Sequence, residues 1–203
     1  MRLYIVRHGQ TSWNKEFRFQ GSEDISLDDT GKNQAYRAGE MLANYEIKKI
    51  YASPLVRASL TAQIIQEKVN SPIFYDDALK EVRLGEWEGL TLTEILAKYK
   101  DEFLAWEEEP EKQIGLGIET YYDLQTRAVG FVEDICKKEN DDLLIVTHGA
   151  WIRALLCKFL NIPLNNRGGF ETLNTGLTIV DCIKRDDSCR FKVVTLNNIS
   201  HLY

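Results

Sequence analysis

The chain has only four cysteines in 203 residues, and no two of them are spaced as a Cys-x-x-Cys pair. Such pairs are typical of zinc sites and of redox motifs. Cys136 and Cys157 lie among apolar residues with helical spacing. We therefore interpret the cysteines, which include Cys182 and Cys189, as reduced core residues rather than as disulfides or metal ligands.

Long hydrophobic runs are also missing. No apolar stretch in the sequence approaches the roughly 18 to 20 residues that cross a bilayer. The first residues do not form a cleavable signal, which needs a charged start and a long apolar segment. We therefore expect a cytoplasmic protein with no membrane partner.

The chain has no excess of positive charge. It carries 25 lysines and arginines against 31 aspartates and glutamates, for a formal net charge of −6. Nucleic acids and other polyanions select broad basic surfaces, so we expect no nucleic-acid partner and look for anion sites only in local pockets. The length and the hydrophobic content of 44% fit one globular domain, which we expect to span residues 1–203.

The sequence does contain short apolar runs that alternate with amphipathic segments. This alternation is typical of a parallel sheet covered by helices. The expected strands are 3–6, 47–52, 143–147, 173–183 and 190–196, with a turn at 184–188, and the expected helices are 28–45, 55–69, 91–106, 119–138 and 150–160. We predict an α/β fold with three layers, α/β/α, and a mostly parallel central sheet.

Two of these apolar runs end in the same unusual way, on His8-Gly9 and on His148-Gly149. A buried strand is costly to end on a titratable side chain unless something outside the sheet receives it. Ligands of open α/β sheets bind at the ends of the strands, so neighbouring parallel strands would place both histidines in one site. The helix that starts at Gly149 and Ala150 adds backbone N–H groups that suit an anion.

Two arginines indicate which ligand such a site takes. Arg7 precedes the first histidine, and Arg57 begins the helix after another strand. The alternative is a metal site made of His8, His148 and Glu81. Unit charges about 4 Å apart interact by roughly 4 kcal/mol at an effective dielectric of 20, and guanidiniums repel a metal cation. They attract phosphoryl oxygens, which match their forked geometry. We expect a small phosphorylated metabolite as the ligand, with no metal or other cofactor.

Catalysis at such a site needs a nucleophile and a proton donor. A neutral imidazole is a competent nucleophile, and flanking guanidiniums lower its pKa, so we assign this role to His8. Its other ring nitrogen should donate to a backbone carbonyl. Glu81 is our candidate proton donor, with Glu86 and Glu88 as competitors. A protein that only binds phosphate needs no proton donor and remains an alternative.

Further short motifs surround these residues, and as a set they resemble the histidine phosphatase superfamily, which includes the cofactor-dependent phosphoglycerate mutases. The resemblance runs from the first residue to Asn198 and His201-Leu202, and it is thin between 96 and 139. The motifs are Arg7-His8-Gly9 with Trp13-Asn14, Arg18-Phe19-Gln20-Gly21, Ser53-Pro54-Leu55 with Arg57-Ala58, the stretch 81–89, and His148-Gly149 with Ile152-Arg153-Ala154-Leu155.

The resemblance implies a role for each matching residue. It places a phosphohistidine on His8 and makes Glu81 the proton donor. It adds substrate-side positions in the loop after the first strand. The implied phosphate pocket consists of Arg7, Arg57 and His148, and the implied substrate-side residues are Asn14, Gln20 and Gly21.

The stretch after Glu81 separates two activities within this family. The known mutases resemble one another in a Glu-Arg-x-Tyr-Gly stretch around the acid, whereas here Glu81 is followed by Val82-Arg83-Leu84-Gly85. That pattern is similar to the small broad-range phosphatases and the α-ribazole phosphate phosphatases. We therefore expect metal-independent hydrolysis of small phosphomonoesters, with a phosphoglycerate mutase as the alternative.

Three features are expected to shape the substrate pocket. The segment around 90–120 resembles a lid. The bulky Trp151 either narrows the pocket or packs in the core, and both interpretations stay open. The aromatic residues Trp13, Phe17, Phe19 and Trp106 either cover the leaving group or anchor their own loops. We expect a monomer or a homodimer.

Overall fold

The computed structural model describes residues 1–185 and 188–203. Its centre is a six-stranded sheet with the order β3-β2-β4-β1-β5-β6. The strands are β1 (Arg2–Arg7), β2 (Lys49–Ala52), β3 (Ile73–Tyr75), β4 (Leu143–Thr147), β5 (Leu177–Arg185) and β6 (Ser188–Asn198). β1 and β4 are parallel neighbours, as are β4 and β2 and then β2 and β3, whereas β5 and β6 add an antiparallel edge next to β1.

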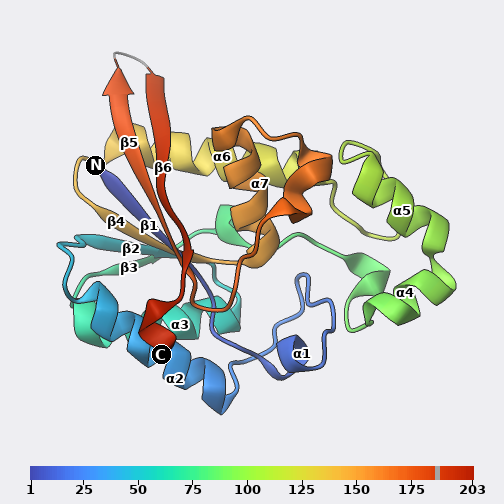
Figure 1. Ribbon diagram of the computed structural model, residues 1–203, viewed down its shortest axis with the longest axis horizontal. Helices are drawn as coiled ribbons and strands as arrows, with labels where there is room; N and C mark the ends of the chain where they lie inside the picture. The colour runs from blue at the N-terminus through green and yellow to red at the C-terminus, as the bar shows by residue number, and fades with distance from the viewer. Residues whose placement is uncertain (186–187) are drawn as a thin grey trace.

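Helices cover both faces of this sheet (Figure 1). The α-helices are α1 (Ser12–Lys15), α2 (Asp29–Leu42), α3 (Val56–Val69), α4 (Leu92–Lys98), α5 (Lys100–Glu108), α6 (Tyr121–Lys138) and α7 (Gly149–Leu160). Short 3₁₀ helices are η1 (Asp77–Leu79), η2 (Gly85–Trp87), η3 (Leu164–Gly169) and η4 (Ser200–Leu202). The α2–α3 pair lies on one side of the sheet and the α6–α7 pair on the other, while α4 and α5 stand beyond the end of the sheet (Figure 1).

The alternation of side chains along β1 divides the core into two halves. Leu3 and Ile5 pack in the half that contains the apolar residues of α6 and α7. Tyr4 and Val6 pack in the half beneath α2 and α3. Successive residues of a strand point to opposite faces, so a strand that is apolar throughout requires helices on both sides. The predicted three-layer α/β/α fold with a mostly parallel sheet is confirmed.

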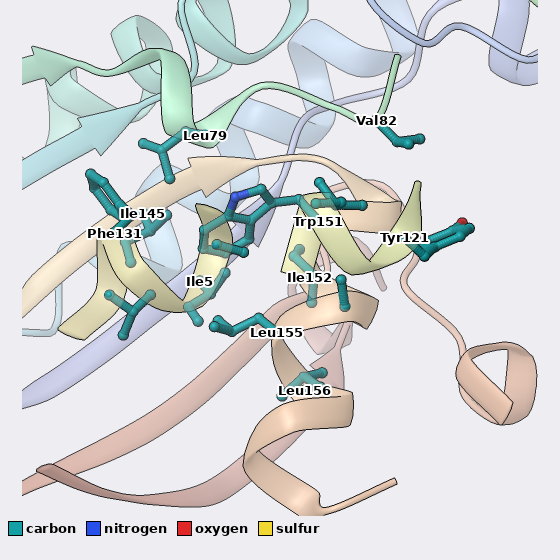
Figure 2. Close-up of a cluster of buried hydrophobic side chains, with 14 of the residues drawn as sticks. Ile5, Leu79, Val82, Tyr121, Phe131, Ile145, Trp151, Ile152, Leu155 and Leu156 are labelled. Carbon is teal, nitrogen blue, oxygen red and sulfur yellow. The ribbon is translucent and has the colours of Figure 1, made fainter. Parts of the chain in front are cut away.

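Trp151 belongs to the core on the α6–α7 side. Its side chain is fully buried among Ile5, Leu79 and Leu155 (Figure 2). The indole Nε1 donates a hydrogen bond to the carbonyl oxygen of Ala78 at 2.8 Å. Of the two interpretations left open for this residue, the structure therefore supports packing in the core.

Several expected boundaries differ from the structure. The single helix expected over 91–106 is two helices, because Tyr99 has a non-helical ψ of 37° between α4 and α5. The helix expected to reach residue 45 ends at Leu42, and the loop after β1 contains the short helix α1. The turn was expected over 184–188, but β5 and β6 still pair at Arg185 and Ser188. The centre of the expected turn, 186–187, lies outside the described residues.

All four cysteines are free thiols, as we predicted. Cys136, Cys157 and Cys182 are buried as free thiols, and Cys189 is a half-buried free thiol. Among the described residues, none of the helices combines the length and the apolar character needed to cross a bilayer.

Candidate active site

The two His-Gly corners meet because β1 and β4 are adjacent parallel strands. Arg7 pairs with Thr147 in the register of these strands, so the next residue of each chain segment is a histidine. The ring centroids of His8 and His148 lie 5.2 Å apart, and neither side chain is more than 2% exposed. The sheet thus places both imidazoles at the same edge, as the parallel arrangement requires.

The imidazole of His8 has a defined orientation. A carbonyl oxygen can only accept, so Nδ1 carries the proton and donates to the oxygen of Gly9 at 2.7 Å. This leaves the lone pair of a neutral ring on Nε2. Burial, and then the charges of Arg57 and Arg7, hold the pKa of His8 well below its usual range. The ring is therefore neutral at pH 7, as a nucleophile must be.

His148 is held in place by a different partner. Its Nε2 lies 2.8 Å from the hydroxyl oxygen of Ser53, which is itself fully buried. Burial, followed by the charge of Arg57, keeps the pKa of His148 well below its usual range. His148 is not among the residues that line the cavity described below, but its ring lies beside that of His8, and its Nδ1 is buried without a partner within the described residues.

The two arginines are fixed by backbone carbonyls. The guanidinium of Arg57, which is fully buried, donates to the oxygens of Gly21 at 2.7 Å and Glu23 at 2.6 Å. Arg7 donates to the oxygen of Thr172 at 2.7 Å. Burial lowers the pKa of Arg7 to about 10, so its guanidinium remains charged at neutral pH. The Nε atoms of both arginines are buried and have no partner within the described residues, which leaves donors for an anion.

Glu81 lies at the beginning of α7. Its carboxylate accepts hydrogen bonds from the backbone N–H groups of Ala150 and Trp151, each at 3.2 Å. We expected the helix start at Gly149 and Ala150 to offer its N–H groups to a bound anion. The structure shows that the N–H of Ala150 is instead used by the side chain of Glu81.

The two competing carboxylates lie outside the cavity. Glu86 accepts a hydrogen bond from the hydroxyl of Tyr99 at 2.9 Å. Glu88 accepts from the backbone N–H of Ser22 at 2.7 Å and of Leu84 at 3.1 Å, and so ties two loops together. Of the three carboxylates proposed as proton donors, Glu81 alone lines the cavity among the described residues.

Arg127, one partner of a partly buried ion pair, holds the loop that carries Glu81. Arg127 of α6 donates to the carbonyl oxygens of Ala78 at 2.9 Å, Lys80 at 2.6 Å and Glu81 at 2.9 Å. The same guanidinium pairs with Glu119 at 2.8 Å. Because all these atoms are at least partly buried, removing the arginine would leave several acceptors unpaired.

These residues surround a cavity of about 720 Å³ at the ends of β1 and β4. Arg7, His8, Arg57 and Glu81 all line it. The predicted substrate-side residues also do so: Asn14, Gln20, Gly21, Gly149 and Ala150. Asn14 also caps α1, because its side-chain oxygen accepts from the backbone N–H of Thr11 at 3.1 Å.

The aromatic residues divide into two groups. Phe17, Phe19 and Trp106 line the cavity, whereas Trp13 packs against Gly89 away from it. Phe17 is 84% exposed, so it lies at the mouth of the cavity. Trp106 is buried and donates through Nε1 to the oxygen of Glu119 at 3.1 Å, which anchors α5 as well as forming part of the wall.

Several lining residues had no role in the sequence-based prediction. Arg153 stands in one of the motifs after His148, and its spacing of four from Gly149 places it on the same side of a helix. That spacing was a usable signal. Glu171, Thr172 and Asn174 come from a polar loop before β5, where no periodic pattern marks a functional residue.

Within residues 1–185 and 188–203, no group of three or more His, Cys, Asp and Glu side chains has the arrangement of a metal centre. The polar groups that face the cavity beside His8 include the guanidiniums of Arg7 and Arg57. A pocket that combines buried guanidiniums with a neutral imidazole at strand ends is characteristic of enzymes that act on phosphoryl groups.

Comparison with known sequences identifies the family. The chain belongs to the histidine phosphatase superfamily (branch 1), whose profile matches residues 3–199. It is 32% identical to phosphoserine phosphatase 1 of Hydrogenobacter thermophilus over 203 residues, which cover 100% of this chain and 94% of that protein. It is 33% identical to the glucosyl-3-phosphoglycerate phosphatase of Mycolicibacterium vanbaalenii over 173 residues, 81% of this chain and 76% of that protein.

Solved structures show the same likeness. Bacillus stearothermophilus YhfR superposes with a TM-score of 0.91 at 33% identity, covering 100% of this chain and 99% of that chain. The mycobacterial glucosyl-3-phosphoglycerate phosphatase in complex with VO3 has a TM-score of 0.86 at 30% identity, covering 97% and 98%. The protein is thus a phosphomonoesterase of the histidine phosphatase type.

Proposed function

We propose that this enzyme hydrolyses small phosphomonoesters without a metal ion, through a phosphohistidine on His8. The observation that carries the proposal is the hydrogen bond from Nδ1 of His8 to the oxygen of Gly9, at 2.7 Å. It fixes the tautomer whose Nε2 lone pair is available to attack phosphorus. The lowered pKa of the same ring keeps that lone pair free of a proton at pH 7.

The proposed reaction has two steps, the transfer of the phosphoryl group to His8 and its hydrolysis. In the first, Nε2 of His8 forms a bond to phosphorus while the ester P–O bond breaks, and Glu81 gives its proton to the leaving oxygen. In the second, water attacks phosphorus and passes a proton to Glu81 while the P–N bond breaks. Inorganic phosphate leaves, and His8 and Glu81 return to their starting states.

Positive charge on the non-bridging oxygens supplies most of the acceleration in this mechanism. One positioned acid contributes only about 10²- to 10⁴-fold, whereas enzymes accelerate monoester hydrolysis by up to ~10²¹-fold. We assign the stabilisation of the phosphoryl oxygens to Arg7, Arg57 and His148. The buried Nε atoms of Arg7 and Arg57 and the buried Nδ1 of His148 have no partner among the residues that the structure describes, which supports this assignment.

Trapping the intermediate tests the proposal. Incubation with ³²P-labelled phosphomonoester and rapid denaturation should leave acid-labile, alkali-stable label on His8. His8→Ala should lose both the label and turnover. His201→Ala is the matched control, because His201 contacts Thr175 and lies outside the cavity, and it should keep both. Full activity of His8→Ala would contradict the assignment of the nucleophile.

A phosphoglycerate mutase on the same fold is the alternative. We favour hydrolysis because the stretch after Glu81 lacks the mutase pattern and because the similar proteins include named phosphatases. Incubation with 3-phosphoglycerate and a trace of the bisphosphate distinguishes the two activities. Release of phosphate without isomerisation is expected, and rapid isomerisation without free phosphate would show a mutase.

The remaining assignments concern the substrate and its surroundings. We propose a small phosphorylated metabolite as substrate, to be sought among phosphoserine, phosphoglycerates, sugar phosphates and α-ribazole phosphate. Asn14, Gln20 and Gly21 are assigned to its side of the pocket. We further propose a single domain, a monomer or homodimer, in the cytoplasm, where free thiols persist.

The segment 90–120 is proposed to act as a cover for this pocket. Leu92 and Trp106, from α4 and α5, line the cavity although their helices stand beyond the sheet (Figure 1). Both helices therefore contribute to the wall on the side away from the strand ends. This arrangement supports a lid that closes over the leaving group.

A further inference from the structure

Ser53 lies beside His148 at the edge of the sheet that carries both histidines. Ala52, the last residue of β2, pairs with Val146 of the neighbouring strand β4, so Ser53 and His148 both follow the strands at this edge. The backbone N–H of Ser53 donates to the oxygen of Val146 at 3.0 Å. The serine is fully buried, and its hydroxyl oxygen lies 2.8 Å from Nε2 of His148.

The hydroxyl of Ser53 has one hydrogen to donate, and this hydrogen needs an acceptor. The hydroxyl oxygen already accepts the backbone N–H of Leu55 at 3.3 Å. Among the described residues, the one acceptor within hydrogen-bond distance of this hydroxyl is Nε2 of His148. A buried donor without an acceptor is costly. The hydroxyl hydrogen therefore points to Nε2, which must itself be free of a proton.

A neutral ring that accepts at Nε2 carries its proton on Nδ1. The ring of His148 is neutral because burial, and then the charge of Arg57, hold its pKa well below the usual value. Its Nδ1 is buried and has no partner within the described part of the chain. The opposite tautomer would leave two buried groups unpaired, the hydroxyl hydrogen of Ser53 and the lone pair of Nδ1. The tautomer with Nδ1–H leaves only a donor, which a phosphoryl oxygen can satisfy.

This Nδ1–H group belongs to a set of donors that surround His8. The Nε atoms of Arg7 and Arg57 are likewise buried without a partner in the described ranges. The ring centroid of His148 lies 5.2 Å from that of His8. Its burial does not separate His148 from this set, because His8 and Arg57 line the cavity and are themselves at most 2% exposed. A phosphoryl group bound at His8 would thus meet three donors that have no other acceptor.

We propose that the hydroxyl of Ser53 fixes the proton of His148 on Nδ1 and so makes this ring a neutral hydrogen-bond donor to a phosphoryl oxygen. The inference rests on the proposed hydrolysis of phosphomonoesters and deepens the role given to His148 there. Ser53 acts through His148 and is therefore a positioning residue. With the proton on Nε2, a lone pair of Nδ1 would face the negative oxygens, and the stabilisation of the transition state would be lost.

The spectrum of the wild-type enzyme tests the tautomer directly. ¹H–¹⁵N correlation spectra of protein labelled with ¹⁵N-histidine distinguish Nδ1–H from Nε2–H in a neutral ring, and His148→Asn identifies the signals of this histidine. At pH 7.5 His148 should carry its proton on Nδ1. Inorganic phosphate, at a concentration that inhibits turnover, should shift this signal and leave those of His201, outside the cavity, in place. A proton on Nε2 of His148, or an Nδ1–H signal that phosphate does not shift, would overturn the proposal.

Ser53→Ala tests the role of the hydroxyl. It should lower kcat/KM for p-nitrophenyl phosphate by about 10- to 100-fold, the range expected for one hydrogen bond to a charged group. His148 should lose its Nδ1–H signal, while His8 keeps the one that Gly9 fixes. Ser71→Ala is the matched control and should change neither measurement. Ser71 is also buried, and its hydroxyl donates to one backbone oxygen, that of Ile47 at 2.7 Å, outside the cavity.

The failures differ in what they contradict. Loss of activity in Ser53→Ala with the Nδ1–H signal of His148 retained would mean that the hydroxyl supports the fold and not the position of the proton. Full activity of this variant would also overturn the proposal. If Ser53→Ala does not fold, the wild-type spectrum decides. If the wild-type enzyme shows the expected tautomer but forms no phosphohistidine and releases no phosphate, the proposed function is wrong and the placement of the proton by Ser53 stands.

Discussion

The orientation of His8 depends on Gly9, a position where a side chain would not fit. Gly9 accepts the Nδ1 hydrogen of His8 through its carbonyl oxygen. It also lies so close to Gly31, near the start of α2, that a Cβ atom on Gly9 would overlap the carbonyl of Gly31. The glycine after the first histidine is therefore needed for close approach of two backbone segments, and the position of that backbone determines the orientation of the imidazole.

Gly9→Ala should destabilise the fold because the backbone of Gly31 cannot move away as a flexible side chain could. We expect the free energy of unfolding to fall by about 1 to 3 kcal/mol, the usual cost of overpacking. Urea unfolding followed by circular dichroism measures the difference. Gly130→Ala is the control: nothing lies within 4 Å of its added Cβ in α6. It should leave stability unchanged or raise it by up to about 1 kcal/mol. Equal effects of the two changes would contradict this account.

At the scale of helices and strands, the spacing of apolar residues in the sequence predicted where the main strands and helices lie. The apolar runs that became β1 and β4 each stop at a histidine, and parallel pairing then brings the two histidines together. The break at Tyr99 was missed because the residues on both sides favour a helix, and it shows only in the backbone angles of that residue.

Contacts between distant segments have no such local signal. Arg127 reaches carbonyl oxygens 46 to 49 residues earlier in the chain, on the loop of Glu81. In the sequence it appears only as one polar residue of an amphipathic helix. The placement of Glu81 in the cavity could be predicted from its motif. The ion pair of Arg127 with Glu119, beside the loop of Glu81, could be identified only once the fold was known.

Arg127→Met should weaken proton donation by Glu81 without removing a group that faces the substrate. The loop 78–81 loses three hydrogen bonds from the guanidinium, so the backbone that carries Glu81 is held less firmly and only the N–H groups of Ala150 and Trp151 still position its carboxyl group. We expect kcat to fall about 10- to 100-fold for an alkyl phosphate, whose leaving oxygen needs a proton. Phosphorylation of His8 by 2,4-dinitrophenyl phosphate, which has a good leaving group, should slow by less than about 3-fold.

Pre-steady-state bursts of the released phenol and alcohol measure this difference. Lys138→Met, at the other end of α6, is the matched control and should affect neither substrate. A purely structural role for Arg127 predicts equal losses with both leaving groups, and that result would show that the ion pair does not position Glu81.

At the scale of the whole molecule, the buried histidines connect the site to the stability of the fold. The chain has three histidines. Burial, which is the main cause in each case, lowers the pKa of all three below the usual 6.5. The folded protein thus keeps the rings of His8 and His148 neutral in a region where Arg7 and Arg57 already concentrate positive charge.

This arrangement predicts that the folded state loses stability in mild acid. Below pH 6.5 the unfolded chain binds protons on histidines that the folded chain leaves neutral, so the free energy of unfolding falls as the pH falls. Each fully buried histidine contributes a slope of at most about 1.4 kcal/mol per pH unit, and the effect vanishes above pH 7. The lowered pKa values of Glu139 and Asp181 act in the same direction but only below about pH 4.5.

Urea unfolding at pH 7.5, 6.5 and 5.5, in a buffer without phosphate, separates the contribution of the histidines from that of the carboxylates. The double variant His8→Asn, His148→Asn should show a clearly smaller loss of stability between pH 6.5 and 5.5 than wild type, because its remaining histidine, His201, is only partly buried. The His201→Asn variant should keep most of the wild-type slope. A wild-type free energy of unfolding that is the same at pH 7.5 and 5.5 would mean that the histidines are not held neutral by the fold, and the tautomer on which the nucleophile depends would lose its physical basis.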